Sequence, residues 1–302
     1  MIPNFSPPSE REKSQALGAL GGSNFSIRKA LSNLQNDFSP IETPSPDDWL
    51  AQNFEPGQTY EQFKPYANIP SKNSKIYIQP YDNIISLETI IVTKKYCNAF
   101  FPGVKFIIRR PINIEDLNIE HREVEWGKQF SACQILNKMY QIAPLDRFAI
   151  IGVTMADIYS GEASNFVFGL ANVITKSGIF SFARYSPSFY GEESENENEI
   201  IIYRAVKVMI HEIGHMFGLL HCIYYSCIMN GSNHIEENDR KPLHLCPICL
   251  RKLHHCLNFN PIERYHNLEK FCRELGGKFL DQAEWYSSRA STIEKSLPKL
   301  RK

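Results

Sequence analysis

The sequence predicts a mixed α+β fold that contains an α/β-like subdomain of alternating strands and helices. Between residues 75 and 185, short segments with strand composition alternate with segments of helical periodicity, which favours a mixed sheet with helices packed against it. Residues 148–154 (FAIIGVT) are apolar apart from the final threonine, as expected for a central strand covered on both faces. With 302 residues, 43% of them apolar, the chain can bury a substantial core.

The individual elements follow in chain order. We expect strands at 75–79, 104–109, 148–154, 166–170 and 179–185, and helices at 86–100, 129–141, about 200–218 and about 261–275. The helix at about 200–218 is apolar nearly all round and should be buried. Cys97 and Cys133 fall within two of the predicted helices, and we interpret both as buried thiols that bind no metal.

The two ends of the chain carry weaker patterns. Prolines and glycines interrupt residues 1–70, so we expect an irregular N-terminal region with short helices beginning at Ser26 and Ser45 and no assigned chemistry. Residues 276–302 are rich in Ser, Lys and Arg and are predicted to be a mobile tail. The main domain is then 71–275, with an upper subdomain at 71–218 and a lower one at 219–275.

Composition excludes several classes of protein. The 33 basic and 33 acidic residues balance, so binding to nucleic acid is not expected. No apolar run is long enough to span a membrane, and the N-terminus has no secretory signal, which predicts a cytoplasmic or nuclear protein. In such a reducing compartment, clustered cysteines are more often metal ligands than disulfides. The oligomeric state is left open.

The strongest motif is His211-Glu212-x-x-His215-x-x-Gly218-x-x-His221 on the predicted buried helix. Histidines four residues apart share one helix face and can bind a single zinc, which would satisfy polar groups that are otherwise costly to bury. Glu212 can reach a water on that metal without ligating it, as a general base should. Gly218 permits a helix ending with positive φ, so that His221 supplies a third nitrogen. Three protein ligands leave one position open, which is typical of catalytic zinc.

A second motif begins at the next residue. Cys222 and Cys227 are followed after eighteen residues by Cys246 and Cys249 in the sequence CPIC. Two thiolate pairs at this spacing predict a closed, tetrahedral zinc site with a structural role. A variant site remains open in which one cysteine is replaced by a nearby donor, namely His244, His254, His255 or Cys256.

The combination HEIGHMFGLLHC, then Cys-x-Met, then CPIC resembles the archaemetzincins, a branch of the metzincin peptidases. The resemblance implies a twisted mixed sheet with backing helices, an active-site helix, a Met-turn at Met229 and a small zinc-stapled C-terminal subdomain. It also implies two zinc ions, one catalytic and one structural, and an edge strand that binds the substrate backbone, for which 166–170 is our candidate. Some metzincins carry a tyrosine two residues after the turn methionine. This chain has Gly231 there.

These motifs predict a zinc metallopeptidase that hydrolyses peptide bonds by zinc-activated water, with Glu212 as the general base. The substrate would be a peptide or protein, and aminopeptidase and endopeptidase activities both remain open. The main alternative is a catalytically weak, zinc-stapled adaptor that binds proteins. A nucleic-acid-binding zinc ribbon is a further alternative, which the balanced charge disfavours although residues 240–241, 251–252 and 295–302 are locally basic.

Overall fold

The computed structural model describes residues 5–32, 37–81, 86–162 and 165–296. Contacts divide the chain into two compact units: unit 1 comprises Met1–Ile69 and Ile213–Lys302, and unit 2 comprises Pro70–Glu212. The division falls inside helix α7 (Glu197–Met216), which is continuous through it. The N-terminal region therefore belongs to the same unit as the C-terminal part of the chain.

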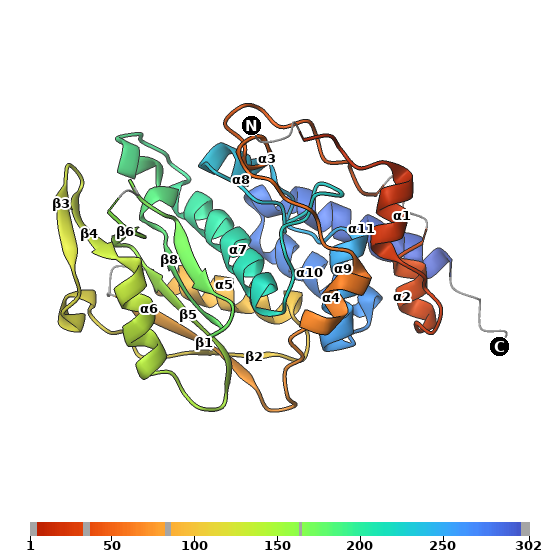
Figure 1. Cartoon of the computed structure of the whole chain (residues 1–302), viewed down its shortest axis with the longest axis horizontal. Coiled ribbons are helices and arrows are strands. Elements are labelled where there is room, and N and C mark those ends of the chain that lie inside the picture. Colours follow the sequence, from red (N-terminus) through yellow and green to blue (C-terminus); the bar gives the residue numbers. More distant parts are fainter. Residues whose placement is uncertain (1–4, 33–36, 82–85, 163–164, 297–302) are drawn as a thin grey trace. The chain divides into compact units, whose positions relative to one another are not determined.

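Unit 2 is organised around a five-stranded sheet in the order β2-β1-β5-β8-β7, which Figure 1 shows together with its helices. All neighbouring strands are parallel except β7, which runs antiparallel to β8 at the edge. The strands are β1 (Lys75–Tyr81), β2 (Lys105–Ile108), β5 (Arg147–Thr154), β7 (Gly169–Asn172) and β8 (Ser177–Ser181). The mixed sheet confirms the predicted α+β fold class.

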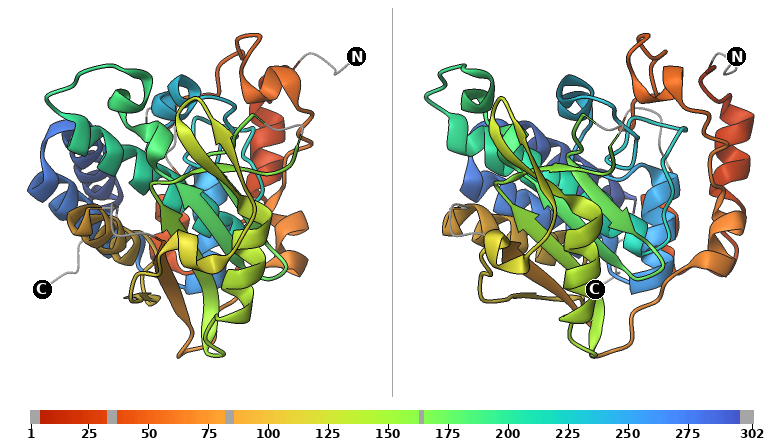
Figure 2. Two further views of the ribbon diagram at one scale, coloured as in Figure 1. Left: turned by 90° about the vertical axis from the view of Figure 1, so that its left-hand side faces the viewer. Right: turned by 60° about the vertical axis from the view of Figure 1, so that its left-hand side comes forward.

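Helices α5 (Leu87–Phe100) and α6 (Ala132–Gln141) cover opposite sides of this sheet, as the left view of Figure 2 shows. Helix α5 connects β1 to β2 on one side of it, whereas α6 precedes β5, which lies on the other side of β1. Because parallel crossovers are right-handed, connections that run in opposite directions along the sheet place their helices on opposite faces. Strand β5 is buried along almost its whole length, which confirms the prediction for the apolar run 148–154. Side chains from α6 and the facing strands form one core, including Tyr77, Tyr81, Ile135, Met139, Ile150 and Ile179.

A second, three-stranded sheet was not predicted. It has the order β3-β4-β6, with β3 (His121–Val124), β4 (Gly127–Ser131) and β6 (Asp157–Tyr159). The helix expected from residue 129 is therefore wrong over 129–131, where Gln129 pairs in register with Asp157 and donates to its carboxylate over 2.7 Å. Cys133, expected to be buried, is exposed because it lies in the first turn of α6 on the side away from the core; its thiol contacts the carbonyl of Ser160.

Two other strands in unit 2 differ in their bounds from expectation. The strand predicted at 166–170 is β7 at 169–172, and the one predicted at 179–185 is β8 followed by a 3-10 turn, η3 (Ala183–Tyr185). Two further 3-10 turns, η2 (Ile114–Leu117) and η4 (Pro187–Tyr190), complete the described part of the unit. Pro187 opens η4, as suits a residue that cannot donate a ladder hydrogen bond.

Unit 1 is helical in its described parts. Its N-terminal elements are α1 (Glu10–Leu17), α2 (Phe25–Ala30), α3 (Trp49–Gln52), α4 (Tyr60–Phe63) and η1 (Lys64–Tyr66). Its C-terminal elements are α8 (Ile235–Arg240), α9 (Pro247–Leu257), α10 (Pro261–Leu275), η5 (Gly277–Phe279) and α11 (Leu280–Lys295). Among the described residues, no helix combines the length and apolarity needed to cross a membrane.

The expectation of a mobile tail over 276–302 is wrong for its described residues. Helix α11 lies beside α10 (Figure 1) and buries Ala283, Tyr286 and Ile293 at helical spacing. The hydroxyl of Tyr286 donates to the carbonyl of Leu243 over 2.9 Å, which anchors the helix. The many polar residues of this segment concealed the apolar stripe when the sequence alone was considered. Residues 297–302 lie outside the described residues.

Residues 5–69 are bound to the C-terminal helices by buried cations. The guanidinium of Arg289, only 1% exposed, donates to the carbonyl of Ala30 over 2.6 Å and forms an ion pair with Asp37. Arg251 in α9 donates to the carbonyl of Ala19 over 2.7 Å. These contacts explain why an N-terminal region with little periodicity is ordered: its free carbonyl groups are satisfied by side chains of α9 and α11.

Candidate metal centres

The last turns of α7 carry the first candidate centre. His211 and His215 lie on one face of the continuous helix, and His221 follows it. The ligand atoms of these three histidines all lie within 4.8 Å of one another. The structure thus brings together the three residues that the sequence motif singled out.

The turn after α7 depends on Gly218. Its φ is +94°, a conformation that glycine adopts readily and other residues rarely do. A Cβ there would also lie 2.5 Å from the carbonyl oxygen of Tyr66, so the close backbone approach excludes a side chain. The backbone N–H of Asn68 donates to the carbonyl of Phe217 over 3.1 Å, and its side chain donates to that of Met216 over 3.0 Å. Residues 66–68 therefore satisfy the end of α7.

Two of the three imidazoles have an acceptor at Nδ1. The Nδ1 of His215 lies 2.6 Å from the carbonyl oxygen of Leu219, and the Nδ1 of His221 lies 2.7 Å from Oε1 of Glu55. An acceptor at Nδ1 favours the tautomer protonated there, which leaves the Nε2 lone pair for a metal. Burial lowers the pKa of His215 to about 4, so this ring is neutral at neutral pH, as a ligand must be. The donor set fits a zinc ion.

Glu212 follows His211 on α7 and is half-buried. Its carboxylate is not among the donor atoms that converge with those of the three histidines. Glu212 is therefore adjacent in sequence to one of the converging histidines without being one of the converging donors.

Met229 packs against the helix that carries the histidines. It is fully buried, and its thioether lies so close to α7 that a Cβ on Gly214 would be 2.5 Å from the sulfur. Gly214 stands between His211 and His215 in the sequence. The methionine predicted to form the Met-turn is thus in contact with the helical turn that separates those two ligand positions.

The four cysteines form the second candidate centre. Cys222, Cys227, Cys246 and Cys249 are buried, and their sulfurs all lie within 4.8 Å of one another. The sulfurs of Cys222 and Cys246 are 3.6 Å apart. Four thiolates around one zinc, each at about 2.3 Å, would be about 3.8 Å apart. The cluster therefore fits a tetrahedral zinc ion.

Hydrogen bonds around the sulfurs support the same fit. The backbone N–H groups of Met229 and Cys246 approach the sulfur of Cys227 at 3.4 and 3.3 Å, and that of Cys249 approaches the sulfur of Cys246 at 3.5 Å. The other three cysteines hydrogen-bond to Cys222 and hold the pKa of its thiol well below the usual range, whereas burial and hydrogen bonds to the other cysteines raise the pKa of Cys246 and Cys249, so without a metal the cluster favours a thiolate at Cys222. Such donors stabilise thiolates, the form that binds metal. None of His244, His254, His255 and Cys256 belongs to the converging donors, so the variant site finds no support among the described residues.

The segment between the two cysteine pairs is held by Asn230. Its side chain donates to the carbonyls of Cys222 and Tyr225 over 2.7 and 3.0 Å, and it accepts from the N–H of Cys227 over 2.7 Å. The N–H of Cys222 donates to the carbonyl of Met229 over 2.8 Å. One asparagine thus fixes the loop that joins the third histidine, the first cysteine pair and the Met-turn.

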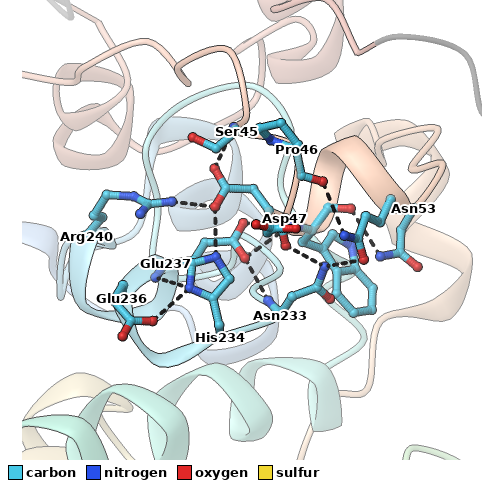
Figure 3. Close-up of polar contacts among 12 residues, drawn as sticks. Ser45, Pro46, Asp47, Asn53, Asn233, His234, Glu236, Glu237 and Arg240 are labelled. Carbon is cyan, nitrogen blue, oxygen red and sulfur yellow. Dashed lines mark hydrogen bonds and ion pairs between the residues drawn. The ribbon is translucent and has the colours of Figure 1, made fainter.

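A third convergence of donors was not predicted. Asp48, His234 and Glu237 also have ligand atoms within 4.8 Å of one another. The guanidinium of Arg240, however, is 2.6 Å from Oδ1 of Asp48, and the imidazole of His234 is 3.1 Å from the same oxygen. This group is an ion-pair network, drawn in Figure 3, that joins the segment before α3 to α8.

Sequence reasoning also missed Glu55. The sequence around it carries no motif, and its partner His221 lies 166 residues away. Contact over such a separation leaves no local signal, so this residue could be found only in the structure.

Residues 77–255, more than half of the chain, match the model of peptidase family M54. The chain belongs to peptidase family M54. Archaemetzincin-2 of Pongo abelii is 37% identical over 278 residues, covering 81% of this chain and 77% of that one. Archaemetzincin-2 of Mus musculus is 36% identical over 288 residues, covering 83% and 80%.

The solved structure of archaemetzincin from Methanopyrus kandleri has the same fold. It superposes with a TM-score of 0.50 at 25% identity and covers 63% of this chain and 98% of that one. Membership of the family makes this chain a zinc metallopeptidase, a hydrolase that acts on peptides or proteins. Residues 1–76 and 256–302 lie outside the family match.

Proposed function

We propose that His211, His215 and His221 hold the catalytic zinc and that Glu212 is the general base for peptide-bond hydrolysis. The observation that supports this most is the convergence of three imidazoles, two of which have Nδ1 occupied by an acceptor. A zinc ion held by these three histidines would supply Lewis acidity toward a carbonyl oxygen and a water molecule.

The protein groups supply the proton transfers. Glu212 accepts a proton from the attacking water at a carboxylate oxygen and then delivers it to the nitrogen of the leaving amine. The peptide C–N bond breaks as the new C–O bond becomes part of the product carboxylate. Met229 packs against Gly214, in the helical turn between His211 and His215, and so limits movement of these two proposed ligands.

We further propose that the four cysteines hold a second, structural zinc. All four are buried and fully engaged with one another, which leaves no open ligand position. This zinc would link the segment 222–230, which follows the third histidine, to the start of α9. The chain would then bind two zinc ions.

The main experiment separates these roles. Zinc content and peptide cleavage are measured for the parent, Glu212→Gln and His215→Ala, using a peptide library in free and N-terminally blocked forms. We expect Glu212→Gln to retain both zinc ions but to lose turnover by a factor of roughly 10² or more. His215→Ala should lose one zinc together with activity. Undiminished cleavage by Glu212→Gln would exclude it as the base, and the blocked peptides distinguish aminopeptidase from endopeptidase.

Strand β7 is our proposed substrate-binding edge. It is the last strand of the sheet, and the N–H of Ser181 donates to the carbonyl of Phe168 over 2.9 Å. In the antiparallel register with β8, this bond makes 168, 170 and 172 the residues bonded to β8, whereas 169 and 171 direct their N–H and C=O groups outward. A substrate strand could pair with those outward groups.

A proline substitution tests this edge. Ala171→Pro removes an outward N–H without removing a hydrogen bond to β8, a position where an edge strand tolerates proline. We expect the KM for peptides to rise several-fold while zinc content is unchanged. Ala171→Val keeps the N–H and is the matched control. Equal KM values for the two variants would show that the outer edge of β7 does not bind substrate.

A further inference from the structure

We propose that Glu55 is a positioning residue for the catalytic zinc site: its carboxylate holds His221 in the orientation and tautomer that present Nε2 to the metal. This rests on the proposed role of His221 as a ligand. Oε1 of Glu55 lies 2.7 Å from Nδ1 of His221, and both side chains are about four-fifths buried, with exposed fractions of 18% and 20%. Carboxylate–histidine pairs of this kind orient a metal ligand and increase its basicity.

Trp49 completes the contact from the same segment. Its indole N–H donates to Oε1 of Glu55 over 2.9 Å, and its ring meets that of His221 edge to face with centroids 5.0 Å apart. The ring fills the space beside Gly231, where a Cβ would be 2.4 Å from the indole. Gly231 is the position at which some metzincins carry a tyrosine. In this chain, the indole of Trp49 occupies the adjoining space and positions His221 together with Glu55.

Trp49 is itself fixed by the ion-pair network of Figure 3. The carboxylate of Glu237 accepts from the backbone N–H of Trp49 over 2.9 Å and from that of Asn233 over 2.6 Å. The side chain of Asn233 donates to the carbonyl of Asp47 over 3.1 Å. The carboxylate of Asp48 accepts from Arg240, as described above. The segment that carries Trp49 is therefore attached to α8 through both backbone and side chains.

The segment after Glu55 contacts the turn that leads to His221. The amide of Gln58 donates to the carbonyl of Gly218 over 3.1 Å and accepts from the N–H of Leu220 over 3.2 Å. The buried ammonium of Lys252 donates to the same amide oxygen over 2.9 Å. Residues 49–58 thus hold both sides of the 218–221 turn, and Glu55 lies between the two points of attachment.

This carboxylate comes from outside the part of the chain that defines the family. The family match begins at residue 77, whereas Glu55 lies in the N-terminal region of unit 1. A region without catalytic motifs therefore tunes a ligand of the catalytic centre. Loss of such a partner typically weakens metal affinity or activity by about 10- to 100-fold.

The first test measures zinc affinity. Zinc is removed selectively from the histidine site, and its return is titrated in competition with a chromophoric chelator, using the full chain. We expect Glu55→Ala to weaken affinity by about 10- to 100-fold. Glu55→Gln keeps an oxygen that can accept from both His221 and Trp49, so its loss should be clearly smaller. Glu61→Ala is the control, because Glu61 is an exposed acid in the same region that pairs with Lys64.

The second test reads the imidazole directly. Long-range ¹H–¹⁵N spectra of the protein without catalytic zinc should show His221 protonated at Nδ1 in the parent and in Glu55→Gln. In Glu55→Ala they should show a mixture with the Nε2-protonated form. A merely structural anchor would lower thermal stability without changing this ratio, so the spectrum distinguishes the two roles.

His215→Ala separates failure of this proposal from failure of the ligand assignment. If His215→Ala retains the zinc, the histidine site itself is wrong. If His215→Ala loses the zinc but Glu55→Ala binds it as tightly as Glu61→Ala does, with His221 still protonated at Nδ1, then the positioning role of Glu55 is overturned.

Discussion

Gly218→Ala should be strongly destabilising, because two independent costs fall on one residue. The φ of +94° places an alanine in a region that costs about 1–2 kcal/mol for residues with a Cβ. The new methyl group would lie 2.5 Å from the carbonyl oxygen of Tyr66, and overpacking of this kind costs about 1–3 kcal/mol. Alanine also lowers the conformational entropy of the unfolded chain, which stabilises the folded state by about 0.4–1 kcal/mol. The net loss in the free energy of unfolding is then about 1–5 kcal/mol.

The matched control is Gly22→Ala in the same unit. Gly22 has a φ of +79°, but a Cβ there meets nothing within 4 Å. This variant carries the backbone strain alone, so we expect a net loss of about 1 kcal/mol or less. Urea unfolding of both variants and the parent, at one fixed excess of zinc, gives the difference that belongs to the contact with Tyr66.

The outcome bears on catalysis as well as stability. If the turn shifts to relieve the contact, His221 moves with it, and the affinity for catalytic zinc should fall in Gly218→Ala but not in Gly22→Ala. Equal losses of unfolding free energy in the two variants would refute the reasoning, since they would mean that the backbone of Tyr66 does not constrain the turn.

Three further predictions concern neighbouring parts of unit 1. Gly214→Ala should cost about 1–3 kcal/mol in overpacking against Met229, partly offset by about 1 kcal/mol of helix propensity, and a double-mutant cycle with Met229→Ala should show clear non-additivity in urea unfolding. Cys249→Ser should reduce zinc content by one ion per chain and lower the thermal midpoint, as measured by elemental analysis and circular dichroism. Burial lowers the pKa of His234, but its hydrogen bonds to Glu236 and Asp48 raise it overall, so its stabilising effect is present at low pH and is lost as pH rises through that raised pKa. The advantage in urea midpoint of the parent over His234→Gln should therefore be full below the ordinary pKa of histidine and shrink as the pH rises above it.

The centres could be read from the sequence because their geometry is local. The spacing of His211 and His215 places them on one face once the helix is recognised, and Gly218 indicates the turn that brings His221 back toward them. The two cysteine pairs similarly stand on short segments whose spacing suits one metal. Short-range spacing carries this information, and the fold needs to contribute only the convergence of the segments.

The central strand of the sheet was predicted best because its burial is almost complete. Strand β5 is apolar because both faces are covered, and it was found within one residue of its bounds at each end. Strand β4 was missed because it is short and partly exposed, and its residues fit a helical period that continues into α6. Its stability comes from pairing with β3 and β6, which periodicity within one segment cannot reveal.

In the N-terminal region, local structure has sequence signals but the long-range contacts have none. Capping boxes at Ser9 with Glu12 and at Thr59 with Gln62 mark α1 and α4, and both signals are visible in the sequence. Nothing in the sequence indicates that the segment between these helices binds the turn before His221. The helices can be predicted from local hydrogen bonding, whereas the role of Glu55 depends on where unit 1 places that segment.

A ligand histidine needs a fixed tautomer as well as a position, and the two requirements are met by different parts of this chain. For His215, the acceptor is the carbonyl of Leu219, four residues away on the same turn, so the family motif itself supplies it. For His221, which follows the turn at Gly218, the acceptor is the carboxylate of Glu55, 166 residues away in the sequence. One of the two proposed ligands is thus oriented from within its own turn and the other by a carboxylate from the N-terminal region. Glu55→Ala should therefore impair the histidine site more than the cysteine site, whose described ligands and sulfur-bound donors lie within 222–249, and zinc titration of each site would show this difference.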